Sequence, residues 1–180
     1  LVRYRVAMPE PHSHLFEVAL TLERPGAAPV LALPVWTPGS YLVREFSRHL
    51  EGLEASDGGG RRLQVERLDK HRFRVVAGGA DRVEVRYRVY ANELTVRTSH
   101  LDGRHGFFNG ANLFLLAEGR EREPCELEIA PPPGWRVSTA LEGGPARFTA
   151  RDYDELVDSP VEIGTHAVAS FAALGRLAKG

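Results

Sequence analysis

The sequence predicts an all-β fold, a twisted antiparallel β-sandwich or a set of saddle-like open sheets, with one short helix near the carboxyl end. Three observations support this prediction. Apolar and charged residues alternate with a period of two along many short segments. Turn-forming glycine, proline and asparagine residues separate these segments at the spacing typical of β-proteins. A helix-capping pattern stands out only near residue 152.

The first strands are expected close to the start of the chain. Val2–Val6 alternates apolar and charged residues, and Leu15–Leu22 places apolar side chains at every second position. Pro25-Gly26 ends this second segment, and the short apolar run Val30–Val35 is a candidate third strand.

Glycine-rich turns are expected to connect the next strands. Ser56–Gly60 separates Leu50–Ala55 from Leu63–Glu66, and its glycines can supply the positive φ angles of a hairpin loop. A strand pattern follows this cluster, whereas a phosphate-binding loop would need a helix there. Phe73–Val76 and Val83–Tyr90 are expected to form another strand pair, joined by a turn at residues 78–81.

The second half of the chain continues the β pattern. Leu94–Thr98 reads as a strand. Asn109-Gly110 is a strong hairpin signal between Gly106–Phe108 and Ala111–Leu116. Three more short strands are expected at residues 127–129, 135–137 and 147–149. A rigid proline turn is expected between the first and the second of them.

One short helix is expected after the last of these strands. Asp152 followed by Glu155 fits an acidic variant of the capping box, and Pro160 would end the helix by Ser159. A single domain then accounts for residues 1–164.

Composition and charge exclude several classes of protein. The net charge of −1 gives no indication of a nucleic-acid or anionic-membrane partner, and the apolar runs are too short for a transmembrane helix. The only cysteine, Cys125, excludes an intramolecular disulfide. Its acidic neighbours disfavour a thiolate, so we expect a buried bystander thiol. The compartment is not determined by the sequence.

The histidines offer two local clusters but no zinc motif. No His-Glu-x-x-His occurs in the sequence. His12 and His14 could share one face of a strand and bind a metal, although neighbouring prolines favour a solvated turn. His100, Asp102 and His105 could form a metal or acid–base site, for which a polar loop cluster is the simpler interpretation.

The remaining chemical candidates have structural explanations. Ser40 lies in a Thr-Pro-Gly-Ser segment that fits a type II turn and not a nucleophile elbow. The crowded carboxylates between Asp152 and Asp158 are explained by helix capping. Residue chemistry alone therefore assigns no catalytic residue and no metal ligand in this chain.

Four blocks, taken in order, resemble the amino-terminal region of glycyl-aminopeptidase-like zinc metallopeptidases, which are thermolysin-like enzymes of the gluzincin type. Trp36–Arg44 resembles their Trp-x-Pro-Gly-Ser-Tyr-x-x-Arg block, and a second block runs from Leu94 to Gly110. The third comprises Pro124-Cys125, Pro133-Gly134-Trp135 and Thr139-Ala140-Leu141. Asp152–Gly164 is similar to the family's join between its β-domain and its catalytic domain.

The resemblance implies a non-catalytic scaffold and substrate-cleft domain of a zinc aminopeptidase that acts on peptides with small amino-terminal residues. Residues 1–164 would form this domain, and residues 165–180 would begin the catalytic domain or form a tail. In the family, zinc is held by His-Glu-x-x-His in the catalytic domain. We therefore expect no cofactor in residues 1–180, and we expect this part of the protein to be inactive alone. The expected partners are its own catalytic domain and a peptide substrate.

The resemblance also points to a substrate-binding stretch. By their place in the order of blocks, Asn109 and Asn112 correspond to a family loop that presents a polar side chain to the free amine of the substrate. An asparagine carbonyl oxygen can accept a hydrogen bond from an ammonium group. The alternative is that Asn109-Gly110 serves only as a hairpin turn.

Two other functions compete with this one. A free-standing β-sandwich could bind a ligand or carbohydrate on exposed Trp and Tyr side chains, and would show a concave aromatic groove. A hydrolase built on His100, Asp102 and His105 would need the three side chains to converge within hydrogen-bonding distance. The aminopeptidase domain should instead expose an apolar patch near its carboxyl end.

Overall fold

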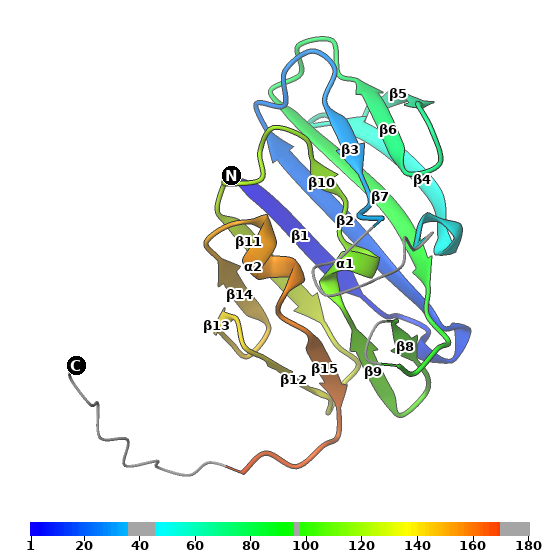
Figure 1. Cartoon of the computed structure of the whole chain (residues 1–180), viewed down its shortest axis with the longest axis vertical. Coiled ribbons are helices and arrows are strands. Elements are labelled where there is room, and N and C mark those ends of the chain that lie inside the picture. Colours follow the sequence, from blue (N-terminus) through cyan, green and yellow to red (C-terminus); the bar gives the residue numbers. More distant parts are fainter. Residues whose placement is uncertain (36–45, 96–97, 170–180) are drawn as a thin grey trace, which may run out of the picture.

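The computed structural model describes residues 1–35, 46–95 and 98–169, and within them the chain is built mainly of β-strands (Figure 1). The strands form one large sheet and one small sheet. This arrangement confirms the predicted all-β, sandwich-like class. The Trp36–Arg44 block and the turn at Ser40 lie outside the described residues, as do residues 170–180.

The large sheet contains eleven strands in the order β10-β3-β6-β5-β4-β7-β2-β1-β11-β14-β13. Its strands are β1 Val2–Ala7, β2 Leu15–Glu23, β3 Val30–Ala32, β4 Leu50–Asp57, β5 Arg62–Arg67, β6 Arg72–Val76, β7 Arg82–Tyr90, β10 Leu116–Ala117, β11 Cys125–Ala130, β13 Glu142–Gly143 and β14 Arg147–Ala150.

The small sheet has four strands in the order β12-β15-β9-β8. They are β8 His100–Leu101, β9 His105–Phe108, β12 Arg136–Thr139 and β15 Val161–Gly164. The helical elements are α1 Gly110–Leu113 and α2 Tyr153–Val157, with 3-10 turns η1 Pro11–Ser13 and η2 Phe46–His49. No helix among the described residues has the length and apolar character needed to cross a membrane.

One strand pair of the large sheet departs from the expected antiparallel pattern. β1 pairs with β2 antiparallel and with β11 parallel, so that Val2 lies opposite Cys125 and Val6 opposite Ile129. The remaining pairs in both sheets are antiparallel among the described residues. The first strand of the chain is therefore an interior strand of the sheet.

The alternation seen in the sequence determines which face of the large sheet is buried. In β7 the side chains at every second position are buried, while Arg86 and Arg88 between them are exposed. The four buried members are Val83, Val85, Tyr87 and Val89. β1 repeats this pattern with Val2, Tyr4 and Val6 inside. Through Tyr4 and Tyr87 the buried face contacts Leu115 and Leu113 at the end of α1, and the exposed face carries charged side chains.

Two of the predicted connections differ in outcome. β4 and β5 form the expected hairpin, with Ala55 opposite Leu63 and Gly60 at φ +84°. The predicted pairing of residues 73–76 with 83–90 is wrong, because β6 pairs with β5 and β3 while β7 pairs with β4 and β2. The turn at Gly78 and Gly79 is present, with both residues at positive φ, but it leads the chain across to another part of the sheet.

The helix α2 forms where the capping pattern predicts it. The Asp152 Oδ1 accepts a hydrogen bond from the backbone N–H of Glu155 at 2.8 Å. The Glu155 carboxylate accepts one from the N–H of Arg151 at 2.6 Å, one residue before the N-cap. The first bond satisfies a donor that a helix N-terminus leaves unpaired, and the second fixes the residue before the cap. The predicted strand at 94–98 is not formed at Leu94 or Thr95, and residues 96–97 lie outside the described part.

Candidate functional site

The two asparagines expected to meet a substrate lie at the start and within the short helix α1. Asn109 occupies the N-cap position with φ −96° and ψ 127°, and its side chain makes no capping hydrogen bond. The backbone N–H of Asn112 donates to the carbonyl oxygen of Asn109 at 2.9 Å. Asn109 is half-buried, whereas Asn112 is 5% exposed. The two residues are three apart, so they share one side of the helical turn.

The predicted hairpin at Asn109-Gly110 is wrong, since Gly110–Leu113 forms α1 and only Leu116 of the expected second strand lies in a strand, β10. Gly110 does not adopt a positive φ angle, so backbone conformation does not explain why a glycine stands there. Its role is steric. A Cβ atom at Gly110 would lie 2.7 Å from the Cα of Val157 and 2.9 Å from the carbonyl oxygen of Leu156. The helix α1 thus rests directly on the backbone at the end of α2.

Three buried tyrosines contact the segment that follows α1, and the sequence analysis missed them. The Tyr87 hydroxyl donates to the carbonyl oxygen of Leu113 at 2.8 Å and accepts from the N–H of Leu115 at 3.1 Å. The Tyr4 hydroxyl donates to the carbonyl oxygen of Leu115 at 2.8 Å. Tyr4 and Tyr87 stand at inward positions of alternating strands, a signal that their hydroxyls need buried partners.

The third tyrosine comes from α2. The Tyr153 hydroxyl donates to the carbonyl oxygen of Phe114 at 2.7 Å. The Phe114 ring packs against Tyr4, with centroids 4.8 Å apart, and against Phe108 in an edge-to-face contact at 5.7 Å. The segment after α1 is therefore fixed by hydroxyls on its backbone and by aromatic rings around its side chains.

His100, Asp102 and His105 lie close together but do not form the arrangement that a hydrolase needs. His100 Nε2 is 3.5 Å from Asp102 Oδ2. Asp102 Oδ1 accepts from the backbone N–H groups of Arg104 at 2.8 Å and His105 at 2.9 Å. Hydrogen bonding from the Arg104 N–H lowers the pKa of Asp102, as does its contact with His100.

The side chain of His105 turns away from that pair. Its Nε2 bonds to the Glu162 carboxylate on β15, and its ring lies 5.8 Å from that of His100. Asp102 thus shapes the turn between β8 and β9, and the required convergence of three side chains is not met. Among the described residues, no group of three or more His, Cys, Asp or Glu side chains could hold a metal ion.

The other histidine pair is also separated. His12 belongs to the 3-10 turn η1, as the neighbouring prolines indicated, and not to a strand. His14, at φ +60°, directs its Nδ1 to the carbonyl oxygen of Leu101. His14 therefore ties η1 to the small sheet and is not placed beside His12 as a second metal ligand.

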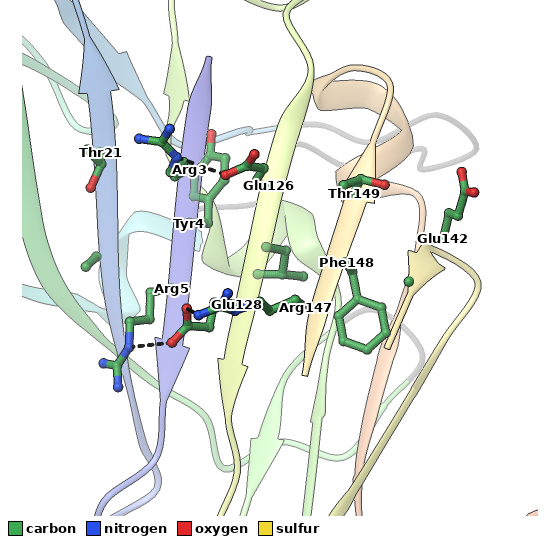
Figure 2. A pocket seen from close by; sticks show the side chains of 13 residues that line it. Arg3, Tyr4, Arg5, Thr21, Glu126, Glu128, Glu142, Arg147, Phe148 and Thr149 are labelled. Carbon is green, nitrogen blue, oxygen red and sulfur yellow. Dashed lines mark hydrogen bonds and ion pairs between the residues drawn. The ribbon is translucent and has the colours of Figure 1, made fainter. Parts of the chain in front are cut away.

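A groove of about 770 Å³ crosses the exposed face of the large sheet over β2, β1, β11, β14 and β13 (Figure 2). Arg3, Arg5 and Arg147 in its lining each pair with a glutamate. Arg3 Nε lies 2.9 Å from Glu126 Oε2, and Arg5 Nε lies 3.3 Å from Glu128 Oε1. The aromatic residues of the lining, Tyr4 and Phe148, are 2% and 6% exposed. This groove lacks the exposed aromatic platform that a carbohydrate-binding module would present.

Cys125 behaves as the sequence indicated. It is the first residue of β11 and is 2% exposed. Burial raises the pKa of its thiol to about 12, and the nearby carboxylates of Asp152 and Glu123 add to this effect. A buried thiol with a raised pKa carries little thiolate at neutral pH, so we expect Cys125 to be unreactive in the folded protein.

Comparison with protein families gives a match over nearly the whole chain. The model of the Peptidase M61 N-terminal domain matches residues 3–165. The chain belongs to the Peptidase M61 N-terminal domain family. This assignment confirms the predicted N-terminal domain of a metallopeptidase. No curated protein sequence gave a significant match.

Solved structures place the M61 N-terminal domain among peptidase folds. An aminopeptidase N family protein from Idiomarina loihiensis superposes with a TM-score of 0.91 at 39% identity, over 97% of this chain and 31% of that protein. A mutant M1 zinc metallopeptidase from Deinococcus radiodurans, bound to a Tyr-Ser-Ala substrate, gives a TM-score of 0.54 at 12% identity. This second match covers 91% of this chain and 41% of that protein, and it shows similarity of fold alone.

The M61 N-terminal domain therefore spans less than half the length of these structures. The second of them is named a zinc enzyme. The described residues of this domain offer no set of ligands that fits zinc. No chemical step can accordingly be assigned to a metal held by this part of the chain.

Proposed function

We propose that this M61 N-terminal domain is the non-catalytic scaffold of a zinc-dependent aminopeptidase and forms one wall of its substrate cleft. The observation that carries this proposal is the 39% identity and TM-score of 0.91 to an aminopeptidase N family protein over 97% of this chain. In this proposal the zinc belongs to a separate catalytic domain of the same polypeptide, and the substrate is a peptide with a small amino-terminal residue.

The proposed division of the chain follows the end of the small sheet. β15 ends at Gly164, and the family match ends at residue 165. We place the β-domain at residues 1–164 and assign residues 165–180 to the beginning of the catalytic domain or to a connecting tail. Val168, just after this boundary, is 59% exposed, but one apolar residue does not make up the apolar patch expected near the carboxyl end.

Within the β-domain, we assign the substrate contact to Asn109 and Asn112. Asn109 stands at the start of α1 and is partly accessible. Its amide oxygen would accept a hydrogen bond from the ammonium group of the substrate. Asn112 shares the same side of the turn and is less accessible, so we assign it the supporting position behind Asn109.

The test is the kinetics of Asn109→Ala in the full-length protein. The KM for a dipeptide with a free amine should rise about tenfold with kcat little changed, because a hydrogen bond to a charged group is lost. Asn92→Ala, a change at an exposed asparagine outside α1, is the matched control and should leave KM unaltered. An unchanged KM in Asn109→Ala would remove the assigned contact.

A further inference from the structure

The segment Leu113–Leu115 consists of the last residue of α1 and the two residues after it, and it is fully buried. Leu113 ends α1, and Phe114 and Leu115 lie between α1 and β10 in neither a helix nor a strand. All three residues are 0% exposed. Buried carbonyl groups need hydrogen-bond donors, and outside a ladder these must come from elsewhere.

Each of these three successive carbonyls accepts a hydrogen bond from a different tyrosine. The three hydroxyls come from β7, α2 and β1, which are far apart in sequence from the residues they contact. Because the donors sit on the large sheet and on α2, the segment has a fixed position relative to both. The three tyrosines, Tyr4, Tyr87 and Tyr153, are 2% to 5% exposed. Water therefore does not compete with their hydroxyls for the carbonyl groups.

The hydroxyls remain donors across the range of pH in which proteins work. Burial raises the pKa of Tyr4, Tyr87 and Tyr153 above the ordinary value of a phenol. Each hydroxyl therefore keeps its proton at neutral pH and can donate its hydrogen bond.

The segment Leu113–Leu115, which the three tyrosines hold, is also joined to the start of α1 by a hydrogen bond. The N–H of Phe114 donates to the carbonyl oxygen of Gly110 at 2.8 Å. Gly110 in turn lies against the backbone at Leu156 and Val157 of α2, which also carries Tyr153. A shift of the segment would move Gly110, and with it the neighbouring Asn109.

We propose that Tyr4, Tyr87 and Tyr153 are positioning residues that hold α1 where Asn109 can meet the amine of a substrate. This inference rests on the substrate contact assigned to Asn109. A polar group that must meet a small cation needs its position fixed within a fraction of an ångström, since a displacement of about 1 Å can cost a large factor in rate or affinity. Three hydroxyls on three adjacent carbonyls provide that precision.

The experiment uses Tyr153→Phe in the full-length protein, with KM and kcat measured on a dipeptide that has a free amine. Loss of the hydroxyl frees the carbonyl of Phe114 and should raise KM about threefold to tenfold, with kcat within about twofold of the native value. Tyr90→Phe, at a tyrosine that is 43% exposed, is the matched control and should leave both constants unchanged.

A second control separates positioning from loss of stability. Leu63→Ala on β5 removes a buried side chain three strands away from β10. It should lower the melting temperature while KM stays at the native value. If Leu63→Ala and Tyr153→Phe raise KM equally at equal loss of stability, the positioning role is overturned.

The double variant Tyr153→Phe/Asn109→Ala tests whether the tyrosine hydrogen bonds affect KM through the position of Asn109. The KM effect of Tyr153→Phe should disappear once Asn109 is replaced. If the effects of the two substitutions on KM are additive, the positioning role of the tyrosines is overturned, even where Asn109→Ala shows that Asn109 contacts the substrate. If Asn109→Ala alone leaves KM unchanged, the assigned substrate contact fails, and the positioning role of the tyrosines fails with it.

Hydrogen exchange gives a readout that is independent of catalysis. Tyr153→Phe should speed exchange at the amides of Asn112 and Phe114, whose hydrogen bonds lie within α1 and its end. Exchange at the amide of Val85 in β7 should change far less. If hydrogen exchange is accelerated equally at all three amides, or is not accelerated at Asn112 and Phe114, the positioning role of Tyr153 is overturned. Neither result would affect the kinetic test of Asn109.

Discussion

Gly110 lies so close to Val157 that a Cβ atom on the glycine would stand 2.7 Å from the Cα of Val157. The contact joins the first residue of α1 to the last residue of α2, two short helices that lie far apart in the sequence. Since the position of a Cβ is set by the backbone and the Val157 Cα is a backbone atom, no side-chain rotation can relieve a clash. The position of α1 is thereby linked to that of α2.

Gly110→Ala should destabilise the protein, although alanine is the better helix former. The propensity gain is about 1 kcal/mol, whereas overpacking against a rigid backbone costs about 3 kcal/mol. We expect a net loss of about 2 kcal/mol in the free energy of unfolding, measured by urea denaturation. Gly103→Ala is the control, because Gly103 has no neighbouring atom within 4 Å of an added Cβ. A more stable Gly110→Ala variant would contradict the close packing.

Cys125 should resist thiol reagents until the protein unfolds. Its pKa is raised from 9.0 to about 12, which lowers the thiolate fraction about a thousandfold at neutral pH, and burial excludes the reagent in addition. The measurement is the labelling rate with a chromogenic disulfide at pH 8, with and without denaturant. Cys125→Ala gives the background. Rapid labelling under native conditions would show that β11 opens at its first residue.

Asp69 should make stability depend on pH between about 4 and 2. Its pKa is lowered from 3.8 to about 2, first by the hydrogen bond from the N–H of His71 and then by the side chain of Arg72. A carboxyl with a lowered folded-state pKa stabilises the protein above its unfolded-state pKa and loses that effect as pH falls through the folded value.

The comparison that tests this is Asp69→Asn against the native protein. The native protein should have the higher urea midpoint at pH 6, and the difference should shrink as the pH is lowered from 4 to 2. If the difference in urea midpoint stays constant down to pH 2, the charge of Asp69 does not contribute to the stability of the turn between β5 and β6.

Local patterns in the sequence were sufficient where the structure is determined locally. The clean alternation of Val83–Val89 reappears as the buried and exposed faces of β7. The cap of α2 was predictable because Asp152 and Glu155 act on donors within one turn. The family resemblance supplied the metallopeptidase assignment, which neither alternation nor charge could reach.

The candidate site was harder to predict because distant contacts determine it. Asn109-Gly110 has the local preference of a hairpin, but contacts with α2 and with three tyrosines stabilise a helix there instead. The error at residues 73–90 has the same origin. A two-glycine turn brings the chain around, but the partner of β6 was set by the hairpin from β5 and by β3, which the spacing does not reveal.

The parallel pairing of β1 with β11 has a consequence for how the protein acquires its structure. During synthesis, β1 can pair with β2 as soon as both have left the ribosome, but its other edge has no partner until residues 125–130 emerge. We therefore expect the edge of β1 that later pairs with β11 to stay unpaired for more than a hundred residues of elongation, with its amide and carbonyl groups available to other chains. Completion of the sheet waits on the slowest kind of contact, one between segments far apart in the chain.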